Sequence, residues 1–182
     1  GNDSAATMIR RDTLTVCATL VSNELTPAEF GLQLFRLGNT YWQSLLDQPA
    51  LVAVEQMNHG HAVVQKLQEL GYKNLWRGHT PAGNELAVPG FKTNPQTRPA
   101  LEGELLEAVR KNAIVVNDYR IVEQLFSYVR NPRTQKTGAA RGKKDDLVLA
   151  LGIGLYVHAR ELMDPVTDPN LIHVGARERL VV

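Results

Sequence analysis

The spacing of hydrophobic positions changes along the chain and predicts strands and helices in turn. Near the N-terminus, residues 5–9 and 13–21 have the composition of two strands, and the polar sequence RRDT between them is typical of a hairpin turn. The sequence TPAEF then predicts a helix start, because Thr26 can cap the helix and Glu29 completes a capping box. The core face of this helix comprises Phe30, Leu34, Leu37 and Tyr41.

Shorter apolar runs alternate with helical patterns over the rest of the chain. The predicted strands cover residues 51–54, 75–77 and 113–116, and the predicted helices cover residues 63–70, 99–111, 118–130 and 145–162. Residues 78–98 are rich in Gly, Pro, Asn and Thr and are expected to form a long loop, and residues 131–144 a second loop that is polar, basic and mobile. Because strands alternate with helices, the sequence predicts an α/β sheet covered by helices.

Composition and charge narrow this picture to an ordinary globular domain. The chain has 182 residues, of which 43% are hydrophobic and 21% charged, so residues 1–182 are expected to form one domain with a tail from residue 164. The net charge of +1 confines any nucleic-acid-binding surface to a local basic segment. The single cysteine, Cys17, excludes an internal disulfide and cysteine-rich zinc patterns. No P-loop or G-x-G-x-x-G nucleotide-binding sequence occurs.

The most apolar predicted helix begins with two adjacent carboxylates, in the sequence GKKDDLVLALGIG at residues 142–154. The apolar run, residues 147–159, is shorter than the roughly 20 residues that cross a bilayer, so a buried helix is expected. One interpretation of Asp145 and Asp146 is that they cap this helix, whose dipole favours negative charge at its start by about 0.3–1 kcal/mol.

A second interpretation combines this pair with Glu55, which ends a predicted buried strand, where open α/β sheets bind ligands. If Glu55 lies close to Asp145 and Asp146, the carboxylates repel one another unless a cation compensates. Oxygen ligands suit Mg²⁺ or Mn²⁺, and Lys143 and Lys144 would then contact phosphates. The simpler alternative pairs Glu55 with a Lys or Arg, and spacing alone does not decide between these interpretations.

Two basic segments are candidate DNA-binding surfaces. The first comprises Arg133, Lys136, Arg141, Lys143 and Lys144. The second is a loop without acidic residues that contains Lys92, Thr93, Asn94, Thr97 and Arg98. Phosphate contacts come mostly from such side chains, although either segment could equally be a solvated loop. Asn58 is expected either to support Glu55 or to cap the helix that follows.

Three stretches carry a resemblance to a known family. They are VAVEQMNHGHAVVQKLQELGYKNLW, GFKTNPQTRPALEGELLEAVR and DDLVLALGIG. In order and spacing they resemble the C-terminal nuclease domain of phage terminase large subunits, from about Ser4 to Ala159. The resemblance implies a ribonuclease H-like mixed sheet flanked by helices. It also implies three acidic positions that hold two divalent metal ions; the second maps to Glu55 and the third to Asp145 or Asp146.

The first acidic position of that family has no counterpart in this chain. Asp3 matches a turn residue that follows the family's first strand, so the missing Asp is expected upstream of residue 1. The chain would then be a fragment of a longer terminase, and its sheet would lack the first strand. Because one metal ligand would be missing, the fragment is expected to have little or no nuclease activity. The alternative is that Asp3 moves in and replaces the missing acid.

The resemblance implies a function as well as a fold. The expected reaction is two-metal endonucleolytic hydrolysis of double-stranded DNA concatemers during genome packaging, with Mg²⁺ or Mn²⁺. The expected partners are double-stranded DNA, the ATPase domain of the same full-length chain, the portal and the small terminase subunit, in the host cytoplasm and without a membrane. The alternatives are another ribonuclease H-like nuclease or transposase, and a non-catalytic DNA-docking module of the packaging motor.

Overall fold

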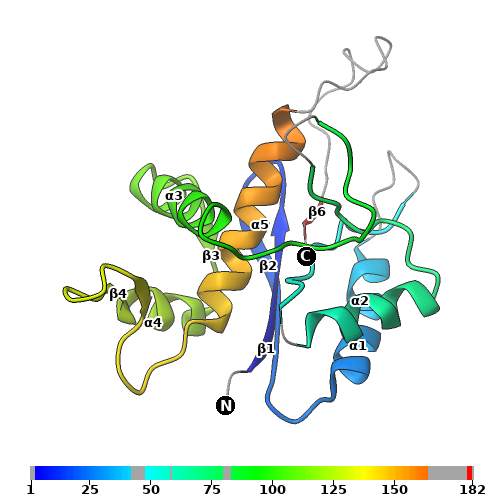
Figure 1. Cartoon of the computed structure of the whole chain (residues 1–182), viewed down its shortest axis with the longest axis horizontal. Coiled ribbons are helices and arrows are strands. Elements are labelled where there is room, and N and C mark those ends of the chain that lie inside the picture. The colour runs from blue at the N-terminus through cyan, green and yellow to red at the C-terminus, as the bar shows by residue number, and fades with distance from the viewer. Residues whose placement is uncertain (1–2, 42–47, 58, 80–82, 164–179, 182) are drawn as a thin grey trace.

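The computed structural model describes residues 3–41, 48–57, 59–79, 83–163 and 180–181. Its elements are β1 (Ser4–Arg10), β2 (Thr15–Ser22), α1 (Pro27–Thr40), α2 (Gly60–Glu69), α3 (Thr97–Arg110), β3 (Val115–Val116), α4 (Tyr119–Ser127), β4 (Tyr128–Arg130), β5 (Thr137–Ala139), α5 (Asp146–Met163) and β6 (Leu180–Val181). Figure 1 shows α5 crossing the strands, with α3 and α4 on one side and α1 and α2 on the other. The prediction of an α/β fold with helices around a mixed sheet is confirmed.

The larger sheet has the strand order β3-β2-β1-β6. The N-terminal hairpin was predicted: β1 and β2 pair antiparallel along their length, with an irregularity between Met8 and Ile9. β3 pairs parallel to β2 at the sheet edge, so Val115 is 48% exposed and the prediction of a buried strand there is wrong. On its other edge β1 pairs only with β6, through Ile9 and Arg10; the rest of that edge has no strand partner among the described residues.

A second set of extended segments lies beside this sheet. Val52 forms a parallel β-bridge with Leu75, and Glu55 forms one with Phe91. Val52 accepts a hydrogen bond from Trp76 N–H at 2.9 Å, and Val54 accepts one from Phe91 N–H at 2.7 Å. The predicted strands at residues 51–54 and 75–77 are therefore extended and paired, but as isolated bridges and not as full strands.

Two layers of helices bury the two faces of β1. On one face, Met8 packs in a cluster with Phe30 of α1 and Leu67 of α2. Thr26 and Glu29 form the predicted capping box at the start of α1. The other face carries Ile9, which packs in a cluster with residues of α5.

Two glycines let α5 approach its neighbours closely. A Cβ atom at Gly154 would lie 2.6 Å from the Ile9 side chain of β1, and one at Gly152 would lie 2.7 Å from the Leu101 side chain of α3. Such distances are shorter than real side-chain contacts, so a side chain at either position would require the end of the Ile9 or Leu101 side chain to shift within the core. The GIG sequence of α5 thus sets how near the helix lies to the strand and to α3.

The predicted polar loop at residues 131–144 contains regular structure. α4 ends at Ser127, three residues before the predicted end, and the chain turns into β4. β4 and β5 pair antiparallel from Tyr128 with Ala139 to Arg130 with Thr137. This β4–β5 hairpin corrects the prediction of an irregular loop.

The predicted tail from residue 164 lies outside the described residues, apart from β6. Within the described ranges, no helix combines the length and the apolar character that crossing a bilayer requires.

Candidate active site

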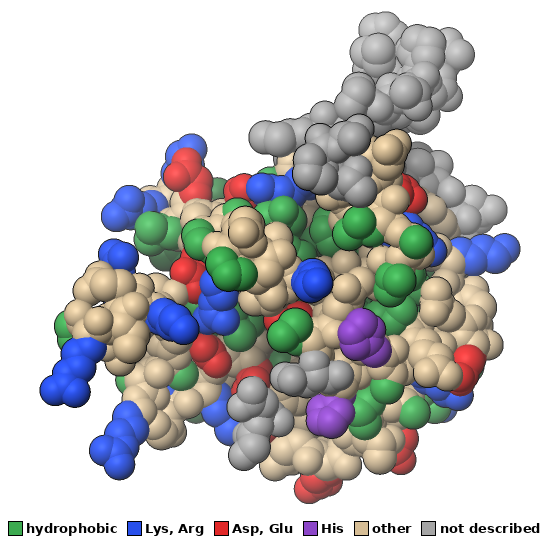
Figure 2. All heavy atoms as spheres, viewed as in Figure 1, with side chains coloured by type: hydrophobic (Ala, Val, Ile, Leu, Met, Phe, Trp, Pro, Cys, Tyr) green, Lys and Arg blue, Asp and Glu red, His purple; other side chains and the backbone are tan. Residues whose placement is uncertain are grey.

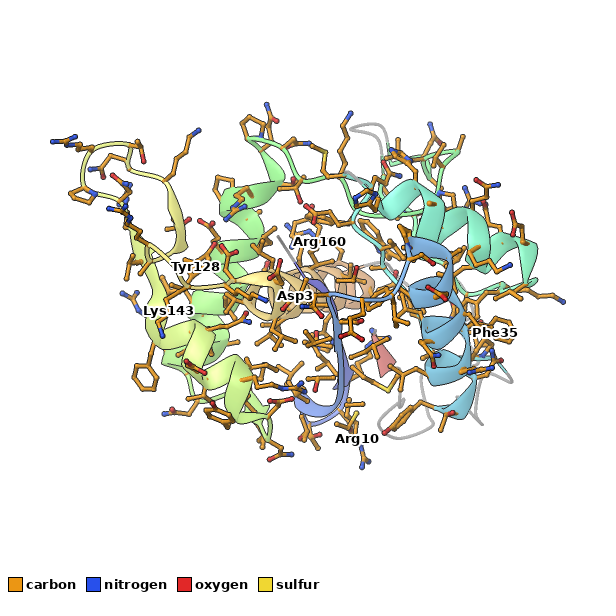
Figure 3. The ribbon with its side chains drawn as sticks, turned by 90° about the horizontal axis from the view of Figure 1, so that it is seen from below. Asp3, Arg10, Phe35, Tyr128, Lys143 and Arg160 are labelled. Atoms are coloured by element: carbon orange, nitrogen blue, oxygen red, sulfur yellow. The ribbon has the colours of Figure 1, made fainter. Side chains whose placement is uncertain are left out.

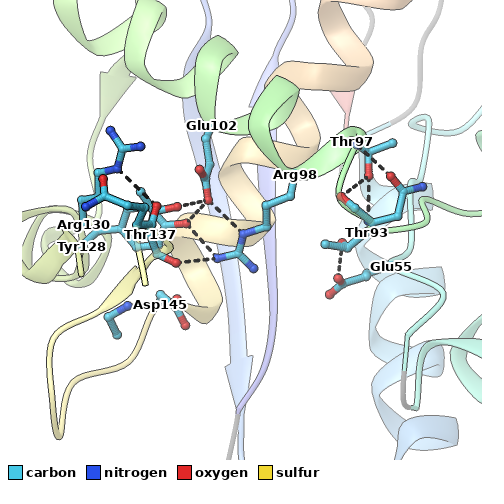
Figure 4. Close-up of polar contacts among 12 residues, drawn as sticks. Glu55, Thr93, Thr97, Arg98, Glu102, Tyr128, Arg130, Thr137 and Asp145 are labelled. Carbon is cyan, nitrogen blue, oxygen red and sulfur yellow. Dashed lines mark hydrogen bonds and ion pairs between the residues drawn. The ribbon is translucent and has the colours of Figure 1, made fainter. Parts of the chain in front are cut away.

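Glu55 is held from two directions. Its side chain accepts a hydrogen bond from the Thr93 hydroxyl, as Figure 4 shows. Its carbonyl oxygen lies so close to Gly60 that a Cβ atom there would be 1.6 Å away. The main chain and the carboxylate of Glu55 are therefore both fixed, the first by the start of α2 and the second by the segment before α3.

The acidic pair does not cap α5 with its side chains. The first main-chain hydrogen bond of this helix runs from Leu149 N–H to the carbonyl oxygen of Asp145, at 2.9 Å. The N–H groups that an N-cap side chain would satisfy are those of Leu147 and Val148. Both donate instead to Oε1 of Gln124 in α4, at 2.9 and 3.4 Å. The capping interpretation of Asp145 and Asp146 is therefore wrong.

Asp145 reaches the β4–β5 hairpin. Its Oδ2 accepts a hydrogen bond from the Ala139 N–H of β5 at 3.2 Å. Gly138 lies beside it: a Cβ atom there would be 3.6 Å from Oδ2, an ordinary contact distance. The hairpin therefore helps to orient this carboxylate.

Asp146 lies beside the N-terminal end of β1. Its Oδ2 accepts a hydrogen bond from Asp3 N–H at 3.4 Å, and the Asp3 carboxylate receives Lys144 Nζ at 2.6 and 2.7 Å. In Figure 3, which shows the molecule from below, Asp3 lies at the centre of the view. Burial raises the pKa of Asp146, and the charges of Asp3 and Asp145 raise it further. The start of α5 thus holds three neighbouring carboxylates, with Lys144 as one nearby compensating charge.

Arg98, a predicted DNA contact, belongs to an internal network. Its Nε donates to Glu102 at 2.9 Å and its Nη2 donates to the Tyr128 hydroxyl at 3.0 Å. Tyr128 and Thr137 of the hairpin also donate to Glu102 (Figure 4). Burial raises the pKa of Glu102, but hydrogen bonds from Thr137, Arg98 and Tyr128 outweigh it and leave that pKa below its usual value. This arrangement favours a structural role for Arg98, which ties the hairpin to α3.

The other predicted DNA contacts lie at the surface. Lys92, Arg141, Lys143 and Lys144 are exposed, and Asn58 lies outside the described residues. Lys143 lies 3.5 Å from Glu123 in a well-exposed pair, which stabilises little. Figure 2 shows Lys and Arg side chains gathered over the end of the molecule that carries α4 and the hairpin. That end contains the predicted positive cluster.

The predicted metal ligands lie in two regions of the structure: Glu55 beside Thr93, and Asp145 and Asp146 at the start of α5. In Figure 4, Glu55 lies beside Thr93 and Asp145 lies near the hairpin, with no interaction drawn between them. Within the described ranges, no three Asp, Glu, His or Cys side chains are arranged so that they could hold a metal ion together. The convergence of Glu55 with Asp145 and Asp146 stays a prediction. The donor chemistry fits Mg²⁺ or Mn²⁺, because every predicted ligand is a carboxylate and a cation would relieve the repulsion at Asp146.

Sequence reasoning missed two residues that hold the acids. The sequence predicts Thr93 only as one residue of the second candidate DNA-binding segment, and it assigns no role to Gln124. Thr93 follows the segment that pairs with Glu55, which is a usable signal once that pairing is known. No local sequence pattern identifies Gln124, because the Leu147 and Val148 N–H groups that donate to it lie 23 and 24 positions further along the chain.

Gly60→Ala is expected to lower the free energy of unfolding by about 1–3 kcal/mol, because the new Cβ would overlap the Glu55 carbonyl oxygen and force the main chain to move. Gly103→Ala is the matched control. Gly103 is an exposed position of α3 with no atom near its missing Cβ, so the change should raise stability by about 0.5–1 kcal/mol. Urea titration measures both, and equal effects would show that the contact at Gly60 is not tight.

Two Asp→Asn changes should have opposite effects on stability. The raised pKa of Asp146 means that its charge opposes folding above about pH 3.8, its usual value, so Asp146→Asn should raise the melting temperature at pH 7 by a few degrees. Hydrogen bonds from Arg120 hold the pKa of Asp118 well below its usual range, so the Asp118 charge stabilises the fold at pH 7. Asp118→Asn should therefore lower the melting temperature at pH 7.

The effect of Asp146→Asn should shrink as the pH falls towards about 3.8, because the raised pKa lets this carboxyl group become protonated in the folded chain before it does in the unfolded one. The effect of Asp118→Asn should shrink only as the pH falls below about 3.8, because its carboxyl group becomes protonated first in the unfolded chain and, lower still, in the folded one. Asn caps helices as well as Asp, so Asp118→Asn keeps the cap of α4. A loss of stability in Asp146→Asn at pH 7, measured by thermal melts in EDTA, would mean that this carboxylate is stabilised where it lies.

Solved structures share this fold. The large terminase nuclease from thermophilic phage G20c with bound magnesium matches with a TM-score of 0.60 and 17% identity, over 86% of this chain and 76% of that one. The same nuclease with bound cobalt matches with a TM-score of 0.60 and 18% identity, over 86% of this chain and 79% of that one. No protein-family model and no curated protein sequence matches the chain. The chain therefore has the fold of a large terminase nuclease.

Proposed function

We propose that this domain is a divalent-metal-dependent nuclease that cuts double-stranded DNA during phage genome packaging. One observation carries the proposal: the acidic pair at the start of α5 is not used to cap the helix, and burial together with neighbouring carboxylates raises the pKa of Asp146. Carboxylates kept in such an environment are more typical of a functional site than of a surface. The fold shared with the magnesium-bound and cobalt-bound nucleases supports the same conclusion.

Glu55, Asp145 and Asp146 would hold Mg²⁺ or Mn²⁺. Bound divalent ions supply charge stabilisation to the attacking and leaving oxygens when a phosphodiester is hydrolysed. The protein residues do the positioning: Thr93 orients the Glu55 carboxylate, and the Ala139 N–H orients that of Asp145. Asp3 adds a further carboxylate beside Asp146, and Lys144 neutralises it.

The β4–β5 hairpin and the turn after it would contact the DNA backbone. Arg133, Lys136 and Arg141 are exposed, and this end of the molecule adjoins Asp145 through Ala139. Lys and Arg contact phosphates without reading the sequence, so binding would be independent of sequence and sensitive to salt. Lys143, Lys144 and Lys92 would extend this surface.

The same proposal places the domain in a terminase that works in the host cytoplasm. Its partners would be the ATPase domain of the full-length chain, the portal and the small terminase subunit. A non-catalytic DNA-docking module is the alternative, and metal binding separates the two.

Saturating Mn²⁺ should stabilise the domain, because a ligand that binds only the folded state at about 100 times its Kd adds about 2.7 kcal/mol. Glu55→Gln and the double change of Asp145 and Asp146 to Asn should reduce this gain by more than half. Glu69→Gln, at an exposed position of α2, is the matched control and should keep it. Calorimetry with Mn²⁺ and with EDTA makes the measurement. Equal gains in all variants would place the metal elsewhere, and no gain in the wild type would favour the docking module.

Changing Arg133, Lys136 and Arg141 together to Ala should reduce the slope of log Kobs against log[salt] for duplex DNA by about 2–3, since each phosphate contact contributes about 0.9. A control variant changes Arg36, Lys73 and Lys111 to Ala, which removes the same charge from exposed positions of α1, the α2–α3 connection and the end of α3. Fluorescence anisotropy from 50 to 300 mM KCl measures both slopes. An equal loss in the two variants would show that the protein's net charge, and not the hairpin, governs binding.

A further inference from the structure

The start of α5 is capped from another helix. Leu147 N–H and Val148 N–H donate to Oε1 of Gln124 in α4, at 2.9 and 3.4 Å. In most helices the residue just before the first turn accepts these bonds, and Asp is among the best residues for that task. In α5 that residue is Asp145, so the strongest local candidate for the cap is not used as one.

Packing fixes the position of Gln124. Ile121, one turn earlier in α4, is fully buried in the cluster that contains Leu147 and Leu151 of α5. Asp118 caps α4 through Arg120 N–H at 2.9 Å and accepts a hydrogen bond from Thr19 of β2. The helix that carries Gln124 is therefore anchored both to α5 and to the sheet.

The two carboxylates beside this cap point to other donors. Asp145 Oδ2 accepts from Ala139 N–H at 3.2 Å, and Asp146 Oδ2 accepts from Asp3 N–H at 3.4 Å. Among the described residues, each carboxylate has one such main-chain donor, so lone pairs remain on both for a cation. If Gln124 were absent, the N–H groups of Leu147 and Val148 would lose their acceptor, and Asp145 stands at the position from which an Asp side chain usually caps them.

We infer that Gln124 is a positioning residue of the acidic pair: it satisfies the first-turn N–H groups of α5 and thereby keeps the Asp145 carboxylate available to a divalent cation. The inference rests on the proposed function, because it takes Asp145 to be a metal ligand. The neutral amide suits this role. It accepts the two hydrogen bonds without adding a further negative charge beside Asp3, Asp145 and Asp146, which already repel one another.

The first experiment needs no metal. Gln124→Met removes the acceptor at nearly constant volume, and Asp145 should then turn to cap the helix. In EDTA, Asp145→Ala should hardly change the melting temperature of the wild type. In the Gln124→Met background the same change should lower it by roughly 2–4 °C, the usual effect of losing a cap in a domain of this size. Equal effects in the two backgrounds would overturn the inference.

The second experiment measures Mn²⁺ affinity by calorimetric titration. Gln124→Met should weaken binding by roughly five- to tenfold, because Asp145 must give up its capping hydrogen bonds before its carboxylate can bind the ion. Gln124→Glu keeps an acceptor oxygen and should bind Mn²⁺ at least as tightly as the wild type. Gln65→Met, an exposed position of α2, is the matched control and should change nothing.

The outcomes separate the inference from the proposed function. If Gln124→Met loses stability but keeps its Mn²⁺ affinity, Gln124 is a structural cap only and the inference fails. If Mn²⁺ does not bind the wild type, or binds it independently of Asp145, the proposed function fails, and with it the role of Gln124 toward a metal. The melting-temperature cycle in EDTA would still report whether Asp145 takes the cap when Gln124 is removed.

Discussion

The packing of α5 across the sheet determines the geometry of the candidate site. This helix shares one buried cluster with Ile9 of β1 and another with Trp76 and Phe91 of the second set of extended segments. Its first turn carries Asp145 and Asp146, and the segments that it covers further along include the partner of Glu55. The glycines of α5 favour this close packing, because a side chain at Gly152 or Gly154 would make the neighbouring Leu101 or Ile9 side chain shift. The distance between the acids of the two regions therefore depends on how α5 lies.

Neutral donors and acceptors hold the charged side chains of this site. The hydroxyl of Thr93 holds Glu55, the amide of Gln124 replaces Asp145 as the cap, and a main-chain N–H of β5 holds the Asp145 carboxylate. Such groups orient a carboxylate without neutralising it, whereas Arg or Lys would compete with a cation for it. Beside Asp145 and Asp146, Asp3 is held by a charged group instead, through its ion pair with Lys144. Asp146 still lies in surroundings that disfavour its charge.

The β4–β5 hairpin connects the predicted DNA surface with the acidic pair. Glu102 anchors the hairpin to α3, with Arg98, Tyr128 and Thr137 as donors. Hydrogen bonds to charged groups contribute about 1.5–3 kcal/mol each, so the anchor is substantial even though it is only partly buried. From the anchored strand, Ala139 reaches Asp145. Contacts that phosphates make with the exposed tip would therefore act on an element that touches the candidate site.

The sequence alone determined the features that depend on neighbours along the chain. The capping box at Thr26, the buried face of α5 and the N-terminal hairpin follow from local spacing, and each is predicted by the sequence and present in the structure. The sequence also indicated the three acids of the candidate site. Glu55 ends a predicted strand, Asp145 and Asp146 begin a predicted helix, and all three match the family resemblance. Their convergence stays a prediction, because 90 residues separate Glu55 from Asp145 and no local rule measures that distance.

Only the tertiary structure decided what those residues are free to do. A helix start rich in Asp predicts a cap, and the cap comes instead from Gln124, because α4 packs against α5 and brings a better placed acceptor. Arg98 is a residue type that often contacts phosphates, but here its guanidinium group donates hydrogen bonds to Glu102 and Tyr128. The hairpin at residues 128–139 lacks a strong strand pattern, and its side chains bind Glu102 of α3. In each case a partner distant in the sequence supplied the hydrogen bond, and hydrogen-bonding groups take the partner that packing brings within reach.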